Sequence, residues 1–200
     1  MTELEQTRDY VKKVTTCFLG VFLFLLASVV EANPQDRAHE TVERFLKWER
    51  SVKPSGIYRG KLGGGLPLLI SPELLCLLES ASDLRERAIR EAPDEKPPFV
   101  EGNPFLPNAW ERPQSSGIIS SSMVPGTKIS IVRVRFDYGA GTVFTGTFRV
   151  YDGAQGAKIS DVDAGGACDF CQRGSLRKEL YTSLQVYSGI NASQCKDLAR

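Results

Sequence analysis

The sequence of 200 residues contains one histidine, no excess of either charge and no recognisable catalytic motif. Because His39 is the single histidine, metal sites that need several histidines are excluded. The 25 basic and 24 acidic residues give a net charge of +1, and no basic run is present, which argues against a nucleic-acid surface. No pattern pairs a nucleophile with a base, so we predict no catalytic residues and no enzyme activity.

No apolar run in the chain reaches the roughly 20 residues that span a bilayer. The longest run, at residues 17–30, follows three basic residues and ends in the small residues of Val-Glu-Ala. This order is typical of a secretory signal peptide. We therefore predict a signal peptide at residues 1–32 and a periplasmic or secreted protein that touches a membrane only through this segment before cleavage. An uncleaved anchor is the alternative, and it still exports the rest of the chain.

Residues 33–200 contain no stretch long enough to act as a linker between two domains. A chain of this length buries roughly two thirds of its surface on folding, which is enough for one hydrophobic core. The sequence therefore predicts a single domain after the signal peptide.

Four cysteines lie in this domain: Cys76, Cys168, Cys171 and Cys195. An even number in an exported chain indicates disulfide bonds, and the spacing leaves three pairings open. A zinc site at Cys168 and Cys171 is the alternative, but the chain lacks a second close pair of cysteines. A redox role for the same two would need a βαβ context, whereas the preceding residues predict antiparallel strands. We expect disulfides and neither a metal nor a cofactor.

Three helices are predicted from capping residues and from apolar residues at helical spacing. The first begins at Asn33 and runs to about Trp48, and His39 lies on its solvated side. The second begins at Ser71 and ends before Pro93. The third begins after Ser175, with leucines four residues apart. The glycine-rich residues 60–65, between the first two helices, lack the residue order of a phosphate-binding loop and are expected to form a flexible connection.

Alternating apolar and polar residues predict two strands, at 128–138 and 142–151, joined by a glycine-containing turn. A third strand is predicted at 157–163. The order of elements indicates an α+β domain with an antiparallel hairpin that has one apolar and one polar face. Arg133 and Arg135 fall on the polar face.

Residues 93–127 are rich in proline and serine and are predicted to be a long loop. Within it are three large apolar residues, Phe105, Leu106 and Trp110. They either pack on the domain or remain exposed to bind a partner. Long loops inside compact domains are often functional, so these aromatic and aliphatic side chains are candidates for partner binding.

Several short segments, spread in order along the domain, carry a family resemblance. They are FLKW at 45–48, LISPEL at 69–74, EGNPF at 101–105, ISDVD at 159–163, CDF at 168–170 and GSL at 174–176. On these segments the chain resembles an uncharacterised family of bacterial exported proteins, which itself resembles the nuclear-transport-factor-2-like (cystatin-like) fold. The resemblance implies N-terminal helices packed on a curved antiparallel sheet, with Cys168 and Cys171 as a staple at the end of the sheet.

The resemblance brings no established activity with it. Some small periplasmic proteins of similar size are immunity proteins that neutralise cell-wall amidases of the type VI secretion system. Inhibition of a secreted cell-wall hydrolase is therefore a hypothesis for this chain.

Two kinds of function remain open at this point. In the first, the domain binds another protein through Arg133 and Arg135 on the exposed hairpin or through the Phe105–Trp110 loop. In the second, a small enzyme or ligand carrier uses the concave face of the sheet, with Asp161 and Asp163 as paired carboxylates on one side of a strand. The missing acid–base partner favours binding, and a capping role for the two aspartates is the simpler expectation.

Overall fold

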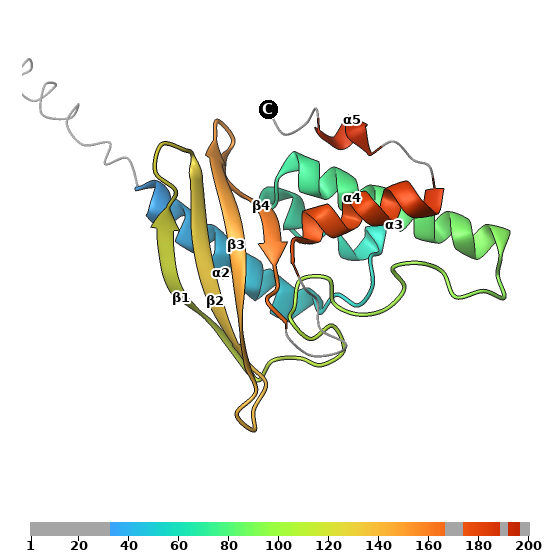
Figure 1. The fold of residues 1–200 in the computed structure, drawn as a ribbon, viewed down its shortest axis with the longest axis horizontal. Helices are drawn as coiled ribbons and strands as arrows, with labels where there is room; N and C mark the ends of the chain where they lie inside the picture. Colours follow the sequence, from blue (N-terminus) through green and yellow to red (C-terminus); the bar gives the residue numbers. More distant parts are fainter. Residues whose placement is uncertain (1–32, 167–173, 189–191, 197–200) are drawn as a thin grey trace, which may run out of the picture. The chain divides into compact units, whose positions relative to one another are not determined.

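A computed structural model describes residues 33–166, 174–188 and 192–196 of the chain (Figure 1). The predicted signal peptide, Cys168 and Cys171 lie outside these residues. Contacts between Cα atoms group the chain from Asn33 onward in one unit. Within the described ranges, no helix combines the length and apolar character needed to cross a membrane.

The fold is α+β, and its elements are as follows. The helices are α2 (Pro34–Val52), α3 (Pro72–Glu91), α4 (Leu176–Ser188) and the short α5 (Ser193–Lys196), with 3-10 turns η1 (Arg59–Lys61) and η2 (Leu66–Leu68). The strands are β1 (Ser115–Met123), β2 (Ile129–Asp137), β3 (Val143–Gly153) and β4 (Gly156–Asp163).

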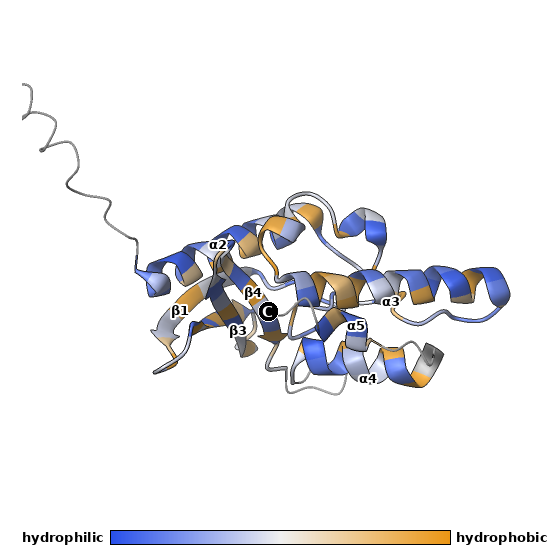
Figure 2. Ribbon diagram, turned by 90° about the horizontal axis from the view of Figure 1, so that it is seen from above, coloured by the Kyte–Doolittle hydropathy of each residue, from blue (hydrophilic) through white to orange (hydrophobic). Residues whose placement is uncertain are grey.

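The four strands form one antiparallel sheet in the order β1-β2-β3-β4. Helix α2 lies across one face of this sheet and contacts every strand (Figures 1 and 2). Helices α3 and α4 pack against each other beside β4, so α3 meets the sheet chiefly at that strand. Of the two helices expected on the sheet, α2 therefore covers its face and α3 flanks its edge.

The predicted helix starts are confirmed by their caps. The side chain of Asn33 accepts a hydrogen bond from the backbone N–H of Gln35, and the Ser71 side chain accepts one from Leu74. The Ser175 hydroxyl likewise accepts from the backbone N–H of Lys178. Each bond satisfies a donor that the first turn of a helix leaves free. Helix α2 continues one turn beyond its predicted end.

The predicted hairpin is confirmed as β2 and β3. Their register places Val132 opposite Phe148 and Val134 opposite Gly146, with these residues on the face that α2 covers. A bulge between β3 and β4 brings Ile159 and Val162, three residues apart, to the same buried face. Strand β4 thus departs from the strict alternation that a strand without a bulge would show.

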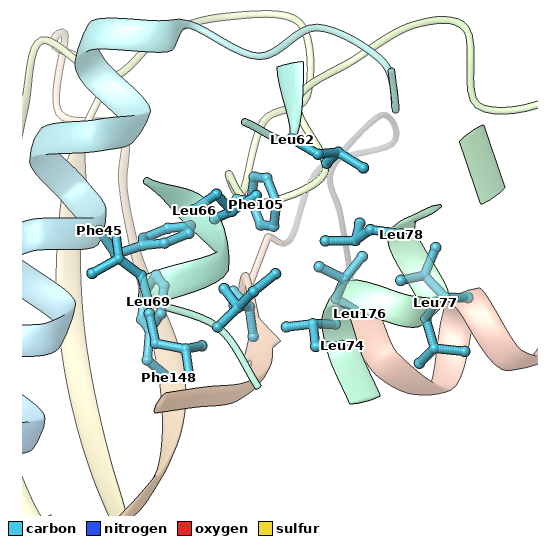
Figure 3. Close-up of a cluster of buried hydrophobic side chains, with 14 of the residues drawn as sticks. Phe45, Leu62, Leu66, Leu69, Leu74, Leu77, Leu78, Phe105, Phe148 and Leu176 are labelled. Atoms are coloured by element: carbon cyan, nitrogen blue, oxygen red, sulfur yellow. The ribbon is translucent and has the colours of Figure 1, made fainter. Parts of the chain in front are cut away.

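The core joins α2, the sheet and α3 in one cluster of buried apolar side chains. Figure 3 shows Phe45, Phe105 and Phe148 gathered near the η2 region, with leucines of α3 beside them. The ring centroid of Phe45 lies 5.2 Å from that of Phe105 and 5.5 Å from that of Phe148. Residues from a helix, a loop and a strand therefore share one aromatic centre.

The loop predicted at residues 93–127 contains a strand, β1, which the sequence pattern did not reveal. This strand reads SSGIISSSM, and its side chains are exposed or half-buried because it lies at the edge of the sheet. Serine and glycine have low strand propensity, so the apolar alternation that marks a strand is absent here. Pairing with β2 supplies the stability that the sequence of β1 lacks.

The glycine-rich connection at residues 60–65 is tied to the domain by specific contacts. Leu62 within it and Leu66 next to it are buried, and the indole Nε1 of Trp48 donates to the carbonyl of Gly63 at 3.2 Å. The expectation of a flexible connection is therefore wrong: two short 3-10 turns and a side-chain hydrogen bond fix its path.

The outer edge of β4 is paired as well. The backbone N–H of Ser71 donates to the carbonyl of Ile159, and the N–H of Ile159 donates to the carbonyl of Leu69, both at 2.8 Å. A short parallel bridge between Ile70 and Ile159 results. In the part of the chain that the structure describes, no strand pairs with the outer edge of β1.

One disulfide is present in the described residues. It joins Cys76 of α3 to Cys195 of α5, across 119 positions of sequence, with the two Cα atoms 5.6 Å apart. This bond attaches the C-terminal helix to α3, and it selects one of the pairings that the sequence left open.

Candidate binding surface

The face of the sheet opposite α2 carries the exposed polar side chains of the hairpin. Register and burial place Arg133, Arg135 and Arg149 on this face, between residues that point into the core. We call this surface the open face. Its other members on β2, β3 and β1 are Ile131, Thr145, Thr147, Tyr151, Ser115, Gly117, Ser120 and Ser122.

The cations of the open face are its three arginines, and Asp137, Asp161 and Asp163 lie on the same side of the sheet. Arg135 forms a 3.5 Å ion pair with Asp137. Within the described residues, Arg133 and Arg149 form no side-chain hydrogen bond or ion pair. Arg133 lies between Thr147 on one side and Ser120 on the other, so both of its cross-strand neighbours have short side chains. The arrangement can donate hydrogen bonds to acidic groups on another molecule.

Phe105 and Leu106 belong to the core. Each is 1 % exposed, so neither is available as a contact for a partner. The packing alternative therefore holds for these two residues. The ring of Phe105 packs against Phe45 and Trp48, and the side chain of Asn103 accepts a hydrogen bond from the N–H of Phe105.

Trp110 differs from its neighbours in the same loop because it is 59 % exposed. Its backbone N–H donates to the side chain of Asn108, whose own N–H donates to the hydroxyl of Tyr138 at the end of β2. A second tie joins Asn103 to Ala109 through their backbones. The indole thus stands exposed on a loop with a fixed backbone, which lowers the entropy cost of placing it in an interface.

Asp161 and Asp163 lie on the same side of β4, as the sequence predicted, and both are used as caps. Asp161 is 6 % exposed and accepts from the Ser175 hydroxyl at 2.6 Å and from the backbone N–H of Arg177 at 3.0 Å. Asp163 accepts from the N–H of Gly165. Since Val162 between them points into the core, the two carboxylates lie on the side of the sheet away from α2.

Sequence reasoning missed the network that Glu73, in the first turn of α3, forms. Glu73 is buried and accepts from the guanidinium of Arg177 at 3.0 Å and from the hydroxyl of Tyr181 at 2.9 Å. Its two oxygens therefore connect α3 to α4. A partner about 100 residues away in sequence leaves no local signal in the chain.

Glu49 is the second buried carboxyl that the sequence did not reveal. Burial raises its pKa, while the hydrogen bond from Asn103 and the charges of Arg112 and Arg50 act in the opposite direction. Nearby, burial also raises the pKa of Tyr138, and the N–H of Asn108 opposes that shift. These groups lie where the last turn of α2 meets the loop and the end of β2.

The described residues contain no group of three or more histidine, cysteine, aspartate or glutamate side chains placed to hold a metal ion. Comparison with family models and with curated proteins finds no match for this chain. The candidate surface therefore rests on its own geometry: three exposed arginines on the open face and an exposed tryptophan on a fixed loop.

Proposed function

We propose that this protein is an exported, non-catalytic binding domain whose open face recognises an acidic surface on another protein. The observation that carries the proposal is the group of exposed arginines on the β2 and β3 part of the open face. Arginine is enriched in protein interfaces because its planar guanidinium binds carboxylates through two hydrogen bonds.

Trp110 supports the same proposal as an apolar anchor. Tryptophan, tyrosine and arginine are the residues that most often dominate binding energy in interfaces. The loop that carries Trp110 is attached to Tyr138, which directly follows the strand that carries Arg133 and Arg135. An acidic partner with an apolar pocket fits both features.

The proposal includes an exported location, a family and a class of partner. The basic and apolar start of the chain and the disulfide between Cys76 and Cys195 support a periplasmic or secreted location. A helix lying on a four-stranded antiparallel meander supports a cystatin-like fold and the resemblance to exported bacterial proteins. An immunity or inhibitor role against a secreted cell-wall hydrolase follows as the specific form of the proposal.

The experiment begins with capture of the partner from the periplasm of the native host and its identification by mass spectrometry. Partner affinity is then measured for Arg133→Glu, with Arg90→Glu on the exposed surface of α3 as the matched charge reversal. We expect Arg133→Glu to weaken binding about tenfold or more and Arg90→Glu to leave it unchanged. Equal affinities of the two variants would refute the role of the open face.

Trp110→Ala separates an anchor from a structural residue. As an anchor, its loss weakens partner binding by about 2 kcal/mol and leaves the melting temperature unchanged, because the indole is exposed. A lower melting temperature with unchanged affinity would contradict the proposal. Turnover of a substrate that depends on Asp161 or Asp163 would replace the binding function with an enzymatic one.

A further inference from the structure

A second polar site lies between the last turn of α2 and residues 112–116, where β1 begins. It is a pocket of about 240 Å³. Its lining includes three cations and one carboxylate: Arg50, Lys53, Arg112 and Glu49. The hydroxyl-bearing residues Ser115 and Ser116 complete the polar lining.

The cations around this pocket are largely free to bind. Arg50 donates from Nη1 to the hydroxyl of Ser116 at 3.1 Å, which fixes the guanidinium at the side of the pocket. The side chains of Lys53 and Arg112 form no hydrogen bond or ion pair with any residue that the structure describes. Arg112 comes from the loop and joins the two other cations at the C-terminal end of α2.

Lys53 occupies its position at a conformational cost. It ends α2 in the left-handed region, with φ 53° and ψ 61°, and its N–H donates to the carbonyl of Glu49. Helices commonly place glycine or asparagine here, because a Cβ atom is disfavoured in this conformation. Strained residues concentrate at functional sites, so lysine at this cap suggests a use for its charge.

Glu49 lies beneath the three cations and reduces their charge. It is 4 % exposed, and its Oε1 accepts from the side-chain amide of Asn103 at 2.9 Å. With Glu49 ionised, the charged groups of the lining sum to about two positive charges. A ligand with two negative charges and several acceptor oxygens matches both the charge and the donors of the pocket.

We propose that this pocket binds a phosphate dianion, either free or as a monoester. Arg112 and Lys53 donate to the phosphate oxygens, and Arg50 with its bound Ser116 hydroxyl closes one side. The pocket, of about 240 Å³, has room for a phosphate group. In a monoester, the group attached to the phosphate would extend toward the solvent.

Calorimetric titration of the full, disulfide-bonded protein with inorganic phosphate tests the proposal at pH 7.5 and constant ionic strength. Acetate, a monoanion, serves as the control ligand, and glycerol phosphate represents a monoester. We expect both phosphates to bind and acetate to bind at least about tenfold more weakly. Tighter binding of glycerol phosphate would assign the ligand to the monoesters, whereas tighter binding of inorganic phosphate would assign it to the free ion. Equal binding of phosphate and acetate would overturn the proposal.

Two variants connect the titration to the pocket. Arg112→Ala should lower phosphate affinity about tenfold or more, because a charge-assisted hydrogen bond is lost. Lys53→Gly should lower phosphate affinity while raising the melting temperature, since it removes both the charge and the backbone strain. Arg90→Ala on α3 removes a charge elsewhere and should change neither quantity. Wild-type phosphate affinity in both pocket variants would overturn the proposal, whatever their melting temperatures.

Discussion

The region formed by α2 and the sheet differs from the region formed by α3, α4 and α5 in the interactions that hold it together. In the first, apolar side chains of α2 pack on β2 and β3 around the aromatic centre of Phe45. In the second, the helices also pack through buried leucines, but a disulfide joins α3 to α5, and hydrogen bonds to Glu73 join α3 to α4. Burial of apolar surface is non-directional, whereas these bonds depend on a few exact partners.

Each region also contains one buried glutamate, and the two are used differently. Both oxygens of Glu73 accept from side chains of α4, so this carboxylate is committed to joining helices. Glu49 accepts from one amide, that of Asn103, and lines the basic pocket. Glu73, with two strong donors, supports the fold, whereas Glu49 has fewer partners and reduces the positive charge of the pocket beside it.

Removal of the disulfide should have the largest effect. The bond between Cys76 and Cys195 closes a long loop, so replacing both cysteines by serine should lower the free energy of unfolding by about 4 kcal/mol. Urea denaturation measures the loss. Hydrogen exchange should become faster in α4 and α5 before it does in β2 and β3. An equal increase in all these elements would show that the two regions do not differ in this way.

Glu73→Gln should have the next largest effect, because it removes the charge that pairs with Arg177 and disturbs the bond from Tyr181. We expect a loss of about 2 kcal/mol in the free energy of unfolding. Glu86→Gln, at an exposed position of the same helix, is the matched control and should change stability by less than about 0.5 kcal/mol. Similar losses in both variants would mean that the network adds nothing to stability.

Glu49 should make stability depend on pH. Because the pKa of Glu49 is raised in the folded protein from 4.5, its contribution is fully present below pH 4.5 and is lost as the pH rises through the folded pKa. In Glu49→Gln, the melting temperature should decline less over this window than in the wild type. A series of thermal melts at increasing pH measures the difference. Parallel curves for the two proteins would contradict the assignment.

Lys53→Gly should have the smallest effect, and with the opposite sign. Glycine adopts the left-handed conformation of residue 53 without strain, although it costs more entropy on folding. We expect a net gain of about 0.5 kcal/mol in the free energy of unfolding, measured by urea denaturation. Lys53→Ala keeps the strain and should show no such gain.

The features that the sequence predicted are those whose signal is local. Asn33, Ser71 and Ser175 cap the helices that follow them, and the hairpin shows alternation over two adjacent strands. The chain order alone was enough to place the arginines of the open face, because side chains alternate along a regular strand.

The features that were missed depend on residues far apart in the chain. Strand β1 is held by its neighbour and not by its own serine-rich sequence, and the burial of Phe105 depends on aromatic contacts with α2 and on Asn103. The pocket beside Glu49 forms only where the end of α2 meets the segment before β1. A residue pattern within one segment carries no information on contacts with distant segments.

The pairing of Leu69–Ser71 with β4 also limits how copies of this protein can associate through their strands. Because the chain's own backbone pairs with that edge at Ile159, the edge left unpaired among the described strands is that of β1. An antiparallel contact between two β1 strands consumes both open edges at once. Growth by strand addition at the described edges therefore stops at a pair of molecules.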